Sequence, residues 1–488
     1  MKSIMIQGTM SGAGKSLLCA ALCRIFAEDG HRTAPFKSQN MALNSFITDE
    51  GLEIGRAQAM QAEAAGIAPS VLHNPILLKP TSDKGSQVIV NGEVMADMSA
   101  REYFRNKKAL VPHIKTAFDT LAKDNDIIVI EGAGSPVELN LLKDDMVNMG
   151  MAEIARSPVL LVGNIDPGGV FAQLLGTLSL LDDKRSYVKG LVVNRFRGDI
   201  TLFDDGVKIL EKRGGVPVAG VIPYIKNTLD DEDSLSDKLR FIPPTADKVN
   251  IAVVRLPKMS NYTDFDAFSD YDDVRISYVT EPYQLDGIDM IVIPGSKSVI
   301  ADMAFLRETG LAERIRSLSQ IIPVFGVCGG YQLLGKSISD PYFSEEGGES
   351  EGLGLLPVKS VFERTKQRTR ISGTFGRVNG VFSALSGAPY EGYEIHMGQT
   401  AGPSADTLTD TGGSQRENIY GTYVHGIFDR AEVSSVIIKA LCEKKNIPFS
   451  GKSHDRRAEK ERQYKLLADT VRKSLDMELV YRILDEGI

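Results

Sequence analysis

The sequence predicts two doubly wound α/β domains, each built on a mostly parallel sheet. The first observation is length, because 488 residues at roughly 150 residues per domain suggest two or three domains. The second is a recurring pattern in which a short apolar segment precedes a Gly-rich turn and a helix-like stretch, as in βαβ units. The third is composition: 42% hydrophobic and 25% charged residues are typical of a globular protein and exclude a fibrous or wholly disordered chain.

The first domain is predicted over residues 1–240. Its expected strands are the apolar segments at residues 3–6, 127–130, 159–162, 190–193 and 216–221. The alternation stops after Leu229, and the acidic residues 230–234, followed by Pro243 and Pro244, predict a linker. We therefore place the domain boundary near residue 240.

The second domain is predicted over residues 241–488. Its expected strands are residues 250–254, 290–293, 322–325 and 419–424. Residues 431–442 predict a helix, and residues 456–488 predict another, because apolar side chains recur there at helical spacing. We assign both C-terminal helices to this domain.

The chain is acidic, with 56 Lys and Arg against 64 Asp and Glu and a net charge of −8. It therefore lacks the basic excess that broad binding to nucleic acid or to an anionic membrane needs, and we expect neither partner. No apolar run approaches the ~20 residues of a membrane span, and the N-terminus lacks the pattern of a secretory signal. Four cysteines in so long a chain predict free thiols, so we expect a cytoplasmic protein.

A Gly-rich loop between the first expected strand and a helical stretch predicts a phosphate site. The loop departs from the spacing GxxxxGK[ST], because Thr9 stands where glycine is usual. Small residues let backbone N–H groups surround phosphate oxygens at a helix N-terminus, and Lys15 can reach the terminal phosphates. An ordinary Gly-rich turn is the alternative. The predicted ATP-binding residues are Gly8, Thr9, Ser11, Gly12, Gly14, Lys15 and Ser16.

A Mg²⁺ ion bound with ATP needs oxygen ligands beside the phosphates. The Ser16 hydroxyl is one predicted ligand, and Glu131, which directly follows the expected strand 127–130, is the other. Asp166, after the strand 159–162, is a second carboxylate candidate. The carboxyl ends of parallel strands meet at one edge of a sheet, so these loops are expected to lie together. An N-cap or turn role is the alternative for Glu131.

A cysteine at a Gly-rich strand-to-helix turn predicts a nucleophile in the second domain. Cys328 is followed by Gly329 and Gly330. A sharp turn exposes the thiol, and the N-terminus of the following helix favours the thiolate. A buried structural cysteine is the alternative, but it would not need such glycines. Cys19 and Cys23, one turn apart on a helix, are expected in the core.

A cysteine nucleophile needs a base. His425 follows the expected strand 419–424 and so lies at the same sheet edge, while His396 is the competing candidate. The turn 294–298 follows another strand and can supply backbone donors to an oxyanion, unless it is a plain turn. The candidates for the oxyanion site, or for holding the substrate that Cys328 attacks, are Gly295, Ser296, Gly329 and Gln332.

Together these motifs resemble those of the cobyric acid synthase family. The first domain is similar to dethiobiotin synthetase in its extended phosphate loop, and the second is similar to class I glutamine amidotransferases in its cysteine turn. The resemblance covers essentially the whole chain and implies an N-terminal P-loop NTPase-like sheet and a C-terminal class I glutamine amidotransferase-like sheet. Segments more specific to the family are residues 38–41, 53–58, 79–80, 131–136, 194–199, 260–266 and 295–297.

The resemblance implies an enzyme of cobalamin synthesis that uses ATP, Mg²⁺ and glutamine on a corrinoid polycarboxylate. Cys328 and His425 would release ammonia from glutamine, and ATP would activate the b, d, e and g carboxylates of adenosylcobyrinic acid a,c-diamide to give adenosylcobyric acid. The alternatives are a cobyrinic acid a,c-diamide synthase and a non-catalytic P-loop ATPase scaffold. Class I amidotransferases commonly carry Glu two residues after the catalytic His; Ile427 stands there, so another group must orient His425.

Overall fold

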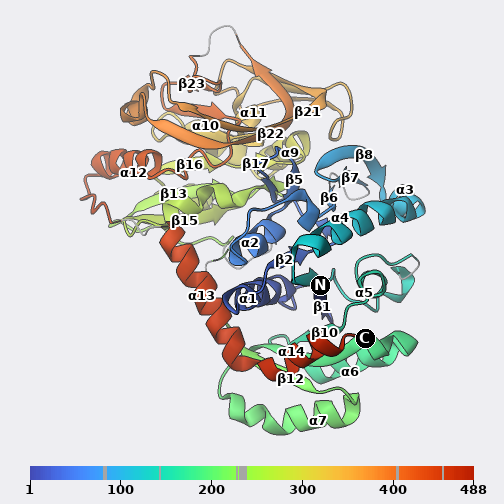
Figure 1. Cartoon of the computed structure of the whole chain (residues 1–488). Coiled ribbons are helices and arrows are strands. Elements are labelled where there is room, and N and C mark those ends of the chain that lie inside the picture. The colour runs from blue at the N-terminus through green and yellow to red at the C-terminus, as the bar shows by residue number, and fades with distance from the viewer. Residues whose placement is uncertain (81–84, 142–143, 227–228, 230–238, 403–405, 453–455) are drawn as a thin grey trace.

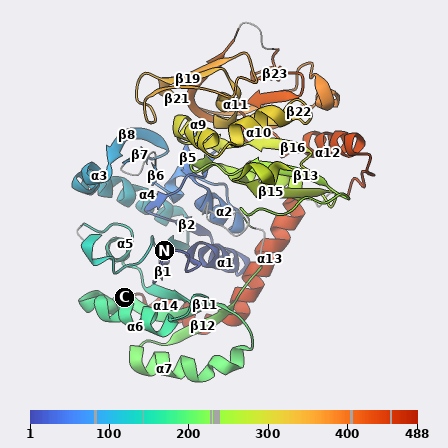
Figure 2. The same ribbon diagram turned by 180° about the vertical axis from the view of Figure 1, so that it is seen from behind.

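The computed structural model describes residues 1–488 except 81–84, 142–143, 227–228, 230–238, 403–405 and 453–455. The predicted acidic linker at residues 230–234 lies outside the described residues. Two α/β layered bodies lie one above the other in Figures 1 and 2, with the N-terminus inside the lower one. Among the described residues, none of the helices combines the length and apolarity needed to cross a membrane.

The first body contains a six-stranded parallel sheet. The five strands expected from the sequence are all present, and a short sixth strand joins them at the edge. The central strands are buried on both faces, which explains their continuous Ile, Val and Leu runs. In spatial order the strands are β12 (Val218–Pro223), β11 (Val188–Phe196), β10 (Val159–Asn164), β1 (Lys2–Gly8), β9 (Ile127–Glu131) and β2 (Thr33–Phe36).

Helices cover both faces of this sheet and bury a core layer on each. One layer contains side chains of α4 (Val111–Asp124), α5 (Met149–Ala155), α6 (Val170–Leu180) and α7 (Asp204–Gly214). The other contains side chains of α1 (Lys15–Glu28) and α2 (Arg56–Ala64), with Cys19 and Cys23 fully buried as expected. The doubly wound arrangement predicted for this domain is confirmed.

The C-terminal helices differ from their prediction in two ways. There are two helices, α13 (Arg456–Ser474) and α14 (Met477–Glu486), because the chain turns at Asp476, whose side chain caps α14 by accepting from the Leu479 N–H. Both pack on the first domain: Leu467 and Val471 of α13 and Ile483 of α14 share the core layer of α1. Figure 1 shows α13, in red, running along the lower body. The apolar spacing predicted a packing helix but not the domain that it packs against.

The second body contains a six-stranded sheet whose strands are parallel except at one edge. The four expected strands are present, and β15 extends the sheet on one side while the antiparallel β23 closes the other. In spatial order they are β15 (Val274–Val279), β13 (Val249–Val254), β16 (Met290–Ile293), β18 (Val324–Val327), β24 (Ile419–Thr422) and β23 (Ser414–Arg416). The covering helices are α8 (Asp266–Ser269), α9 (Val299–Glu308), α10 (Leu311–Leu318), α11 (Gly329–Leu334) and α12 (Ala431–Lys445).

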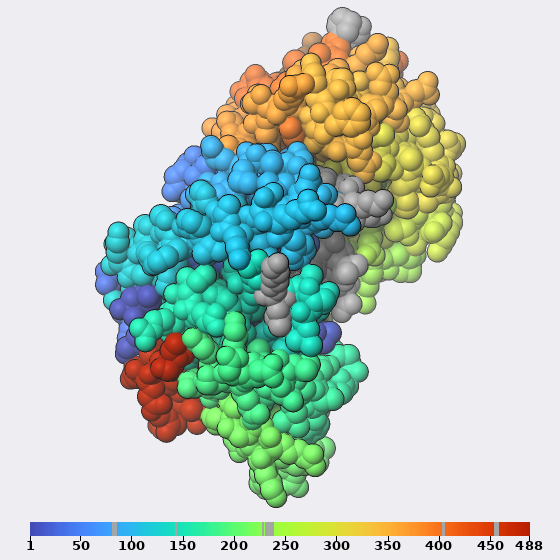
Figure 3. Space-filling model, turned by 90° about the vertical axis from the view of Figure 1, so that its right-hand side faces the viewer, coloured from blue at the N-terminus to red at the C-terminus, as the bar shows by residue number. Residues whose placement is uncertain are grey.

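Smaller sheets, which the sequence analysis does not predict, join the two bodies. In the second domain a long hairpin, β21 (Lys359–Thr374) and β22 (Pro389–Ala401), pairs through β21 with β19 (Ser337–Asp340), which in turn pairs with β20 (Gly348–Glu351). In the first domain β4 (Ser45–Ile47) pairs with β5 (Glu53–Gly55), which runs directly into α2. In Figure 3 the blue surface of the first domain meets the orange surface of the second. The remaining elements are β3 (Gln39–Met41), β6 (Ile76–Pro80), β7 (Gly85–Val90), β8 (Glu93–Ser99), α3 (Ala100–Asn106), β14 (Met259–Ser260) and β17 (Gly295–Ser296).

A buried ion cluster links the two domains. Glu53 of the first domain is fully buried and pairs with Lys79 of the same domain and, at 2.7 Å, with Lys366 of the long hairpin. Burial acts to raise the pKa of Glu53, but the two ammonium groups outweigh it and hold that pKa well below its usual range. Glu53 is therefore a carboxylate that neutralises charge contributed by both domains.

Replacing Glu53 by glutamine is expected to lower the free energy of unfolding by about 3–5 kcal/mol, because two buried ammonium groups lose their carboxylate. The control is Glu50→Gln on the exposed turn of the same hairpin, with an expected effect within about 0.5 kcal/mol. Since the folded state lowers the Glu53 pKa, its stabilisation is complete above the ordinary glutamate pKa and declines as the pH falls below it. Chemical denaturation at several pH values measures this, and equal stability of the two variants at neutral pH would contradict it.

Candidate active site

The loop between β1 and α1 has the backbone geometry of a phosphate cradle. Gly14 caps α1 with a positive φ of 88°, and a Cβ there would lie 2.2 Å from the Asn194 amide nitrogen, so no other residue fits. Gly8 ends β1, and Lys15 begins α1. Lys15 Nζ donates to the carbonyls of Met10 and Gly134, which holds the ammonium across the mouth of the loop. The predicted loop residues therefore lie at one helix N-terminus, as anion binding requires.

Glu131, at the carboxyl end of β9, lies against this loop. Ser16 Oγ donates to Glu131 Oε1 at 2.8 Å, so the structure brings together the two predicted Mg²⁺ ligands. Lys37 Nζ lies 2.8 Å from the same oxygen, and Gln61 donates to the other oxygen at 2.5 Å. Burial acts to raise the pKa of Glu131, but Lys37 and these hydrogen bonds outweigh it and lower that pKa, so Glu131 is a carboxylate.

One hydroxyl and one carboxylate fit a Mg²⁺ ion, which commonly takes one or two protein ligands and completes its shell with phosphate oxygens and water. The part of the chain that the structure describes holds no cluster of three or more His, Cys, Asp or Glu side chains suited to a metal. Any Mg²⁺ at Ser16 and Glu131 would therefore depend on phosphate oxygens and water for most of its ligands. Asp166, the second candidate, is instead paired with Arg197 at 2.7 Å.

Cys328 lies in a strained turn between β18 and α11. Its φ of 51° and ψ of −108° are rare for a residue with a side chain. The turn is tight, and Gly330 lies against the strand β16. A Cβ on Gly330 would lie 1.9 Å from the Ile293 carbonyl oxygen, so this position requires glycine. The strain holds the Cys328 side chain at the carboxyl edge of the sheet, where the sequence analysis predicts the nucleophile.

His425 and Cys328 are brought together, and a third residue that the sequence analysis does not identify completes the group. His425 is buried beside Cys328 and is hydrogen-bonded through Nδ1 to Asp264 Oδ2 at 2.7 Å, while the Cys328 thiol donates to the Ile395 carbonyl at 3.7 Å. Asp264 Oδ1 also accepts from the Gly426 N–H at 3.1 Å. Burial acts to lower the pKa of His425, but the charges of Asp264 and Cys328 outweigh it and raise that pKa to about 10. Asp264 thus orients His425, the role for which the sequence analysis had no residue because Ile427 stands where Glu is common.

The predicted oxyanion turn lies beside this group. A Cβ on Gly329 would lie 2.6 Å from the Ser296 amide nitrogen, and one on Gly295 would lie 3.2 Å from His425 Cε1. The backbone of the turn 294–298 therefore lies against both the Cys328 turn and the His425 ring. The Ser296 hydroxyl is used elsewhere, since it donates to Asp302 Oδ2 at 2.5 Å. Only the backbone groups of Ser296 are left to serve as oxyanion donors.

The two other predicted residues, Gln332 and His396, both contact Tyr423. Gln332 is buried and donates to the Tyr423 hydroxyl at 3.3 Å. His396, the competing base, stacks on the Tyr423 ring at 3.7 Å and bonds through Nδ1 to the Gly398 carbonyl at 2.7 Å. The structure therefore pairs Cys328 with His425 and gives His396 a packing position.

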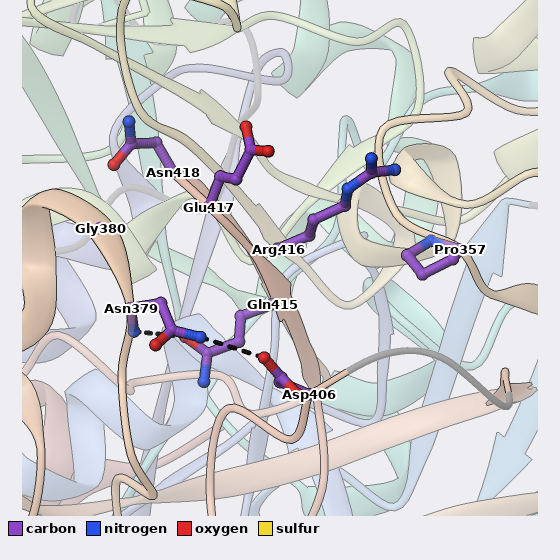
Figure 4. A pocket seen from close by; sticks show the side chains of 8 residues that line it. All are labelled: Pro357, Asn379, Gly380, Asp406, Gln415, Arg416, Glu417 and Asn418. Carbon is purple, nitrogen blue, oxygen red and sulfur yellow. Dashed lines mark hydrogen bonds between the residues drawn. The ribbon is translucent and has the colours of Figure 1, made fainter.

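A cavity of about 750 Å³ in the second domain lies apart from these residues (Figure 4). Its lining includes Arg416, which ends β23, and Glu417 and Asn418, which form the turn between β23 and β24. This turn lies at the amino ends of the parallel strands, whereas Cys328 and His425 follow the carboxyl ends. The cavity therefore belongs to the opposite edge of the sheet.

Comparisons with known proteins agree with this geometry. Residues 250–433 match the family model described as the CobB/CobQ-like glutamine amidotransferase domain, and residues 4–235 match that of the CobQ/CobB/MinD/ParA nucleotide binding domain. The protein is therefore an enzyme of the glutamine amidotransferase class with an attached nucleotide-binding domain. This excludes the non-catalytic scaffold considered from the sequence.

Whole-chain relatives identify the family. The chain is 51% identical to a cobyric acid synthase of Lachnoclostridium phytofermentans over 100% of both chains. It is also 51% identical to a cobyric acid synthase of Ruminiclostridium cellulolyticum, over 100% of this chain and 98% of that one. The chain belongs to the cobyric acid synthase family, as its motifs predict.

Proposed function

We propose that the protein transfers the amide nitrogen of glutamine to the b, d, e and g carboxylates of adenosylcobyrinic acid a,c-diamide, with ATP as the activating substrate, to give adenosylcobyric acid. The observation that carries this proposal is one chain with two chemical sites: a cysteine–histidine–aspartate group and a phosphate cradle beside a carboxylate. Family membership supports the corrinoid substrate.

In the second domain, Cys328 Sγ would attack the carboxamide carbon of glutamine. A positively charged His425 beside the sulfur stabilises the thiolate and can donate a proton to the departing ammonia, which leaves a thioester. The backbone N–H groups of Ser296 and Gly329, whose turns lie in contact, would stabilise the oxyanion of the tetrahedral intermediate. Water then attacks the thioester carbon and glutamate leaves, which regenerates Cys328.

In the first domain, a corrinoid carboxylate would attack the terminal phosphorus of ATP, with ADP as the leaving group. Ammonia would then attack the carbonyl carbon of the acyl phosphate, and phosphate would leave as the amide forms. Lys15 and the loop amides would hold the phosphates. Mg²⁺ held by Ser16 and Glu131 would neutralise phosphate charge.

Counting amidations tests the choice of substrate. With glutamine, ATP and Mg²⁺, mass spectrometry of the product formed from adenosylcobyrinic acid a,c-diamide is expected to show four carboxylates converted to amides. A cobyrinic acid a,c-diamide synthase, the alternative with the same chemistry, would leave this substrate unchanged and amidate cobyrinic acid twice. That pattern would overturn our choice.

Asp264→Asn is expected to lower kcat for glutamine hydrolysis by roughly tenfold to a hundredfold, because the amide no longer supports a charged His425. Since Asp264 raises the His425 pKa, its loss lowers that pKa, and the alkaline limb of the kcat profile moves to lower pH. The control is Asp270→Asn, just beyond α8 in the same segment, with an unchanged profile expected. An unchanged alkaline limb in Asp264→Asn would contradict the role of Asp264.

A further inference from the structure

The group around His425 is supported by a residue of the other domain, Ser45. Ser45 opens β4, is 2% exposed, and uses all three of its polar groups. Its N–H donates to Asn261 Oδ1 at 3.3 Å, its carbonyl accepts from the Tyr393 hydroxyl at 3.5 Å, and its Oγ accepts from Lys79 Nζ at 2.9 Å. Two of these three contacts cross the domain boundary: one reaches Tyr393, which stacks on His425, and the other reaches Asn261, which is bonded to Asp264.

The first of these residues positions Asp264. Asn261 is buried in the left-handed region at φ 51°, which Asn tolerates better than most residues. It begins the short helical turn that contains Asp264, and its carbonyl accepts from the Asp264 N–H at 3.1 Å. Any shift of Asn261 therefore moves the carboxylate that holds His425 Nδ1. The preceding residues of this segment, in β14, pair with β17 of the oxyanion turn.

The second residue covers the face of the histidine ring. Tyr393 stacks on His425 with ring centroids 5.3 Å apart and planes 24° apart. The two backbones also bond to each other, with the His425 N–H donating to the Tyr393 carbonyl at 2.8 Å. The imidazole is thus held on its edge by Asp264 and on its face by Tyr393. Both supports are connected to Ser45 by hydrogen bonds, Tyr393 directly and Asp264 through Asn261.

Ser45 itself is fixed from the first domain. Lys79, which donates to its hydroxyl, belongs to the buried ion cluster with Glu53 and Lys366. Strand β5, the partner of β4, continues into α2, where Gln58 and Gln61 donate to Glu131 at 3.3 and 2.5 Å. The hairpin is therefore connected to both chemical sites, to one through α2 and to the other through Asn261 and Tyr393. Figures 1 and 2 place β5 between the two bodies.

We propose that Ser45 of the first domain is a positioning residue for His425, acting through Asn261 and Tyr393, so that the glutamine-hydrolysing site is complete only when the β4–β5 hairpin is seated against it. This inference rests on the proposed function, in which His425 serves Cys328. The role proposed for Ser45 differs from general docking of the two domains, because it concerns the orientation of the His425 imidazole. Glutamine turnover should depend on the contacts of Ser45, whereas ammonia-dependent amidation in the first domain should not.

Three single variants remove these contacts with little change in shape. Tyr393→Phe deletes the hydroxyl but keeps the stacked ring, and Asn261→Gly deletes the amide acceptor while tolerating the left-handed backbone. Asn261→Asp restores an acceptor oxygen at the same position. Arg370→Ala is the matched control. Arg370 lies opposite Tyr393 in the β21–β22 ladder, and its guanidinium donates across the boundary to the Ile47 carbonyl of the same strand, so the variant removes a boundary contact but keeps the backbone pairing and the Tyr393 hydroxyl.

Glutaminase kcat is expected to fall about tenfold in Tyr393→Phe and in Asn261→Gly, as for loss of one buried hydrogen bond, with KM for glutamine and ammonia-dependent amidation within about twofold of wild type. Asn261→Asp and Arg370→Ala should keep kcat within about twofold. A parallel fall with both nitrogen sources, failure of Asn261→Asp to restore kcat, or an equal fall in Arg370→Ala would overturn the inference. Cys328→Ala in the same assay distinguishes failure of the proposed function from failure of this inference. If Cys328→Ala still hydrolyses glutamine, the proposed function fails, whatever the variants of the Ser45 contacts show.

Discussion

Cys328→Ala is expected to reduce glutamine-dependent amidation by at least about 10³-fold while ammonia-dependent amidation continues. The reason is the separation of the two sites: Cys328 lies at the carboxyl edge of the second sheet, whereas the phosphate loop and Glu131 lie in the first domain. Without the thiol no thioester forms, but added ammonia can still attack an activated carboxylate. Rates with glutamine and with an ammonium salt at high pH measure both activities.

Cys442→Ala is the control for loss of a buried thiol. Cys442 lies on α12, fully buried in the same core, and contributes nothing to the cysteine–histidine–aspartate group. Both activities should remain within about twofold of wild type, since most substitutions away from a site act on stability instead. Glutamine hydrolysis by Cys328→Ala would show that another residue is the nucleophile.

Lys15→Gln is expected to reduce amidation from either nitrogen source by roughly 10²–10³-fold, because a positioned cation that stabilises transferring phosphate is lost. The neutral amide keeps much of the side-chain length but not the charge that spans the Met10 and Gly134 carbonyls. Glutamine hydrolysis should persist within about threefold, since Cys328 and His425 are untouched. Phosphate release and amide formation are measured together.

The control for Lys15→Gln is Lys2→Gln, at the opposite end of β1. Lys2 is exposed and pairs with Asp485 of α14, so Lys2→Gln changes one charge on the same strand without reaching the loop. It should leave both activities unchanged. If Lys15→Gln instead amidated from ammonia at the wild-type rate, the phosphate site would be wrongly placed.

Local patterns were sufficient to predict much of the fold and to select candidate reactive residues that the structure brings together. A strand, a Gly-rich loop and a helix occur within a single stretch of sequence, so the cradle around Lys15 could be predicted from its neighbours. The same holds for Cys328, whose turn is set by adjacent glycines that approach Ile293 and Ser296. Glu131 ends the apolar strand β9 and His425 comes shortly after β24, and parallel topology brings such positions to the carboxyl edge of each sheet.

Contacts between distant segments could not be predicted in this way. Asp264 reaches His425 from 161 residues away, and nothing in the spacing around either residue indicates that pair. The short strands of the β4–β5 hairpin and the half-exposed β21 do not form buried apolar runs, so the domain interface they build stayed hidden. The tail showed an apolar stripe, which indicates packing but carries no information about the partner surface on α1.

The acidic composition also acquires a structural explanation. A net charge of −8 suits neither ATP nor a polycarboxylate, yet the cradle offers Lys15 and a helix N-terminus, and Lys37 lies against Glu131 beside it. Buried lysines and backbone amides thus supply positive potential locally while the chain as a whole stays acidic. If both anions bind as proposed, their binding depends on the placement of a few groups and not on total charge.

Isotope transfer from glutamine tests the central claim most directly. The protein is incubated with adenosylcobyrinic acid a,c-diamide, ATP, Mg²⁺ and glutamine labelled with ¹⁵N at the amide, and the mass of the corrinoid product is measured. We predict a tetra-amidated product that carries ¹⁵N at each new amide in the wild type, and no labelled product from Cys328→Ala, which should form the unlabelled tetra-amide when ordinary ammonium is added. Labelled product from Cys328→Ala, or wild-type product without label, would contradict the account.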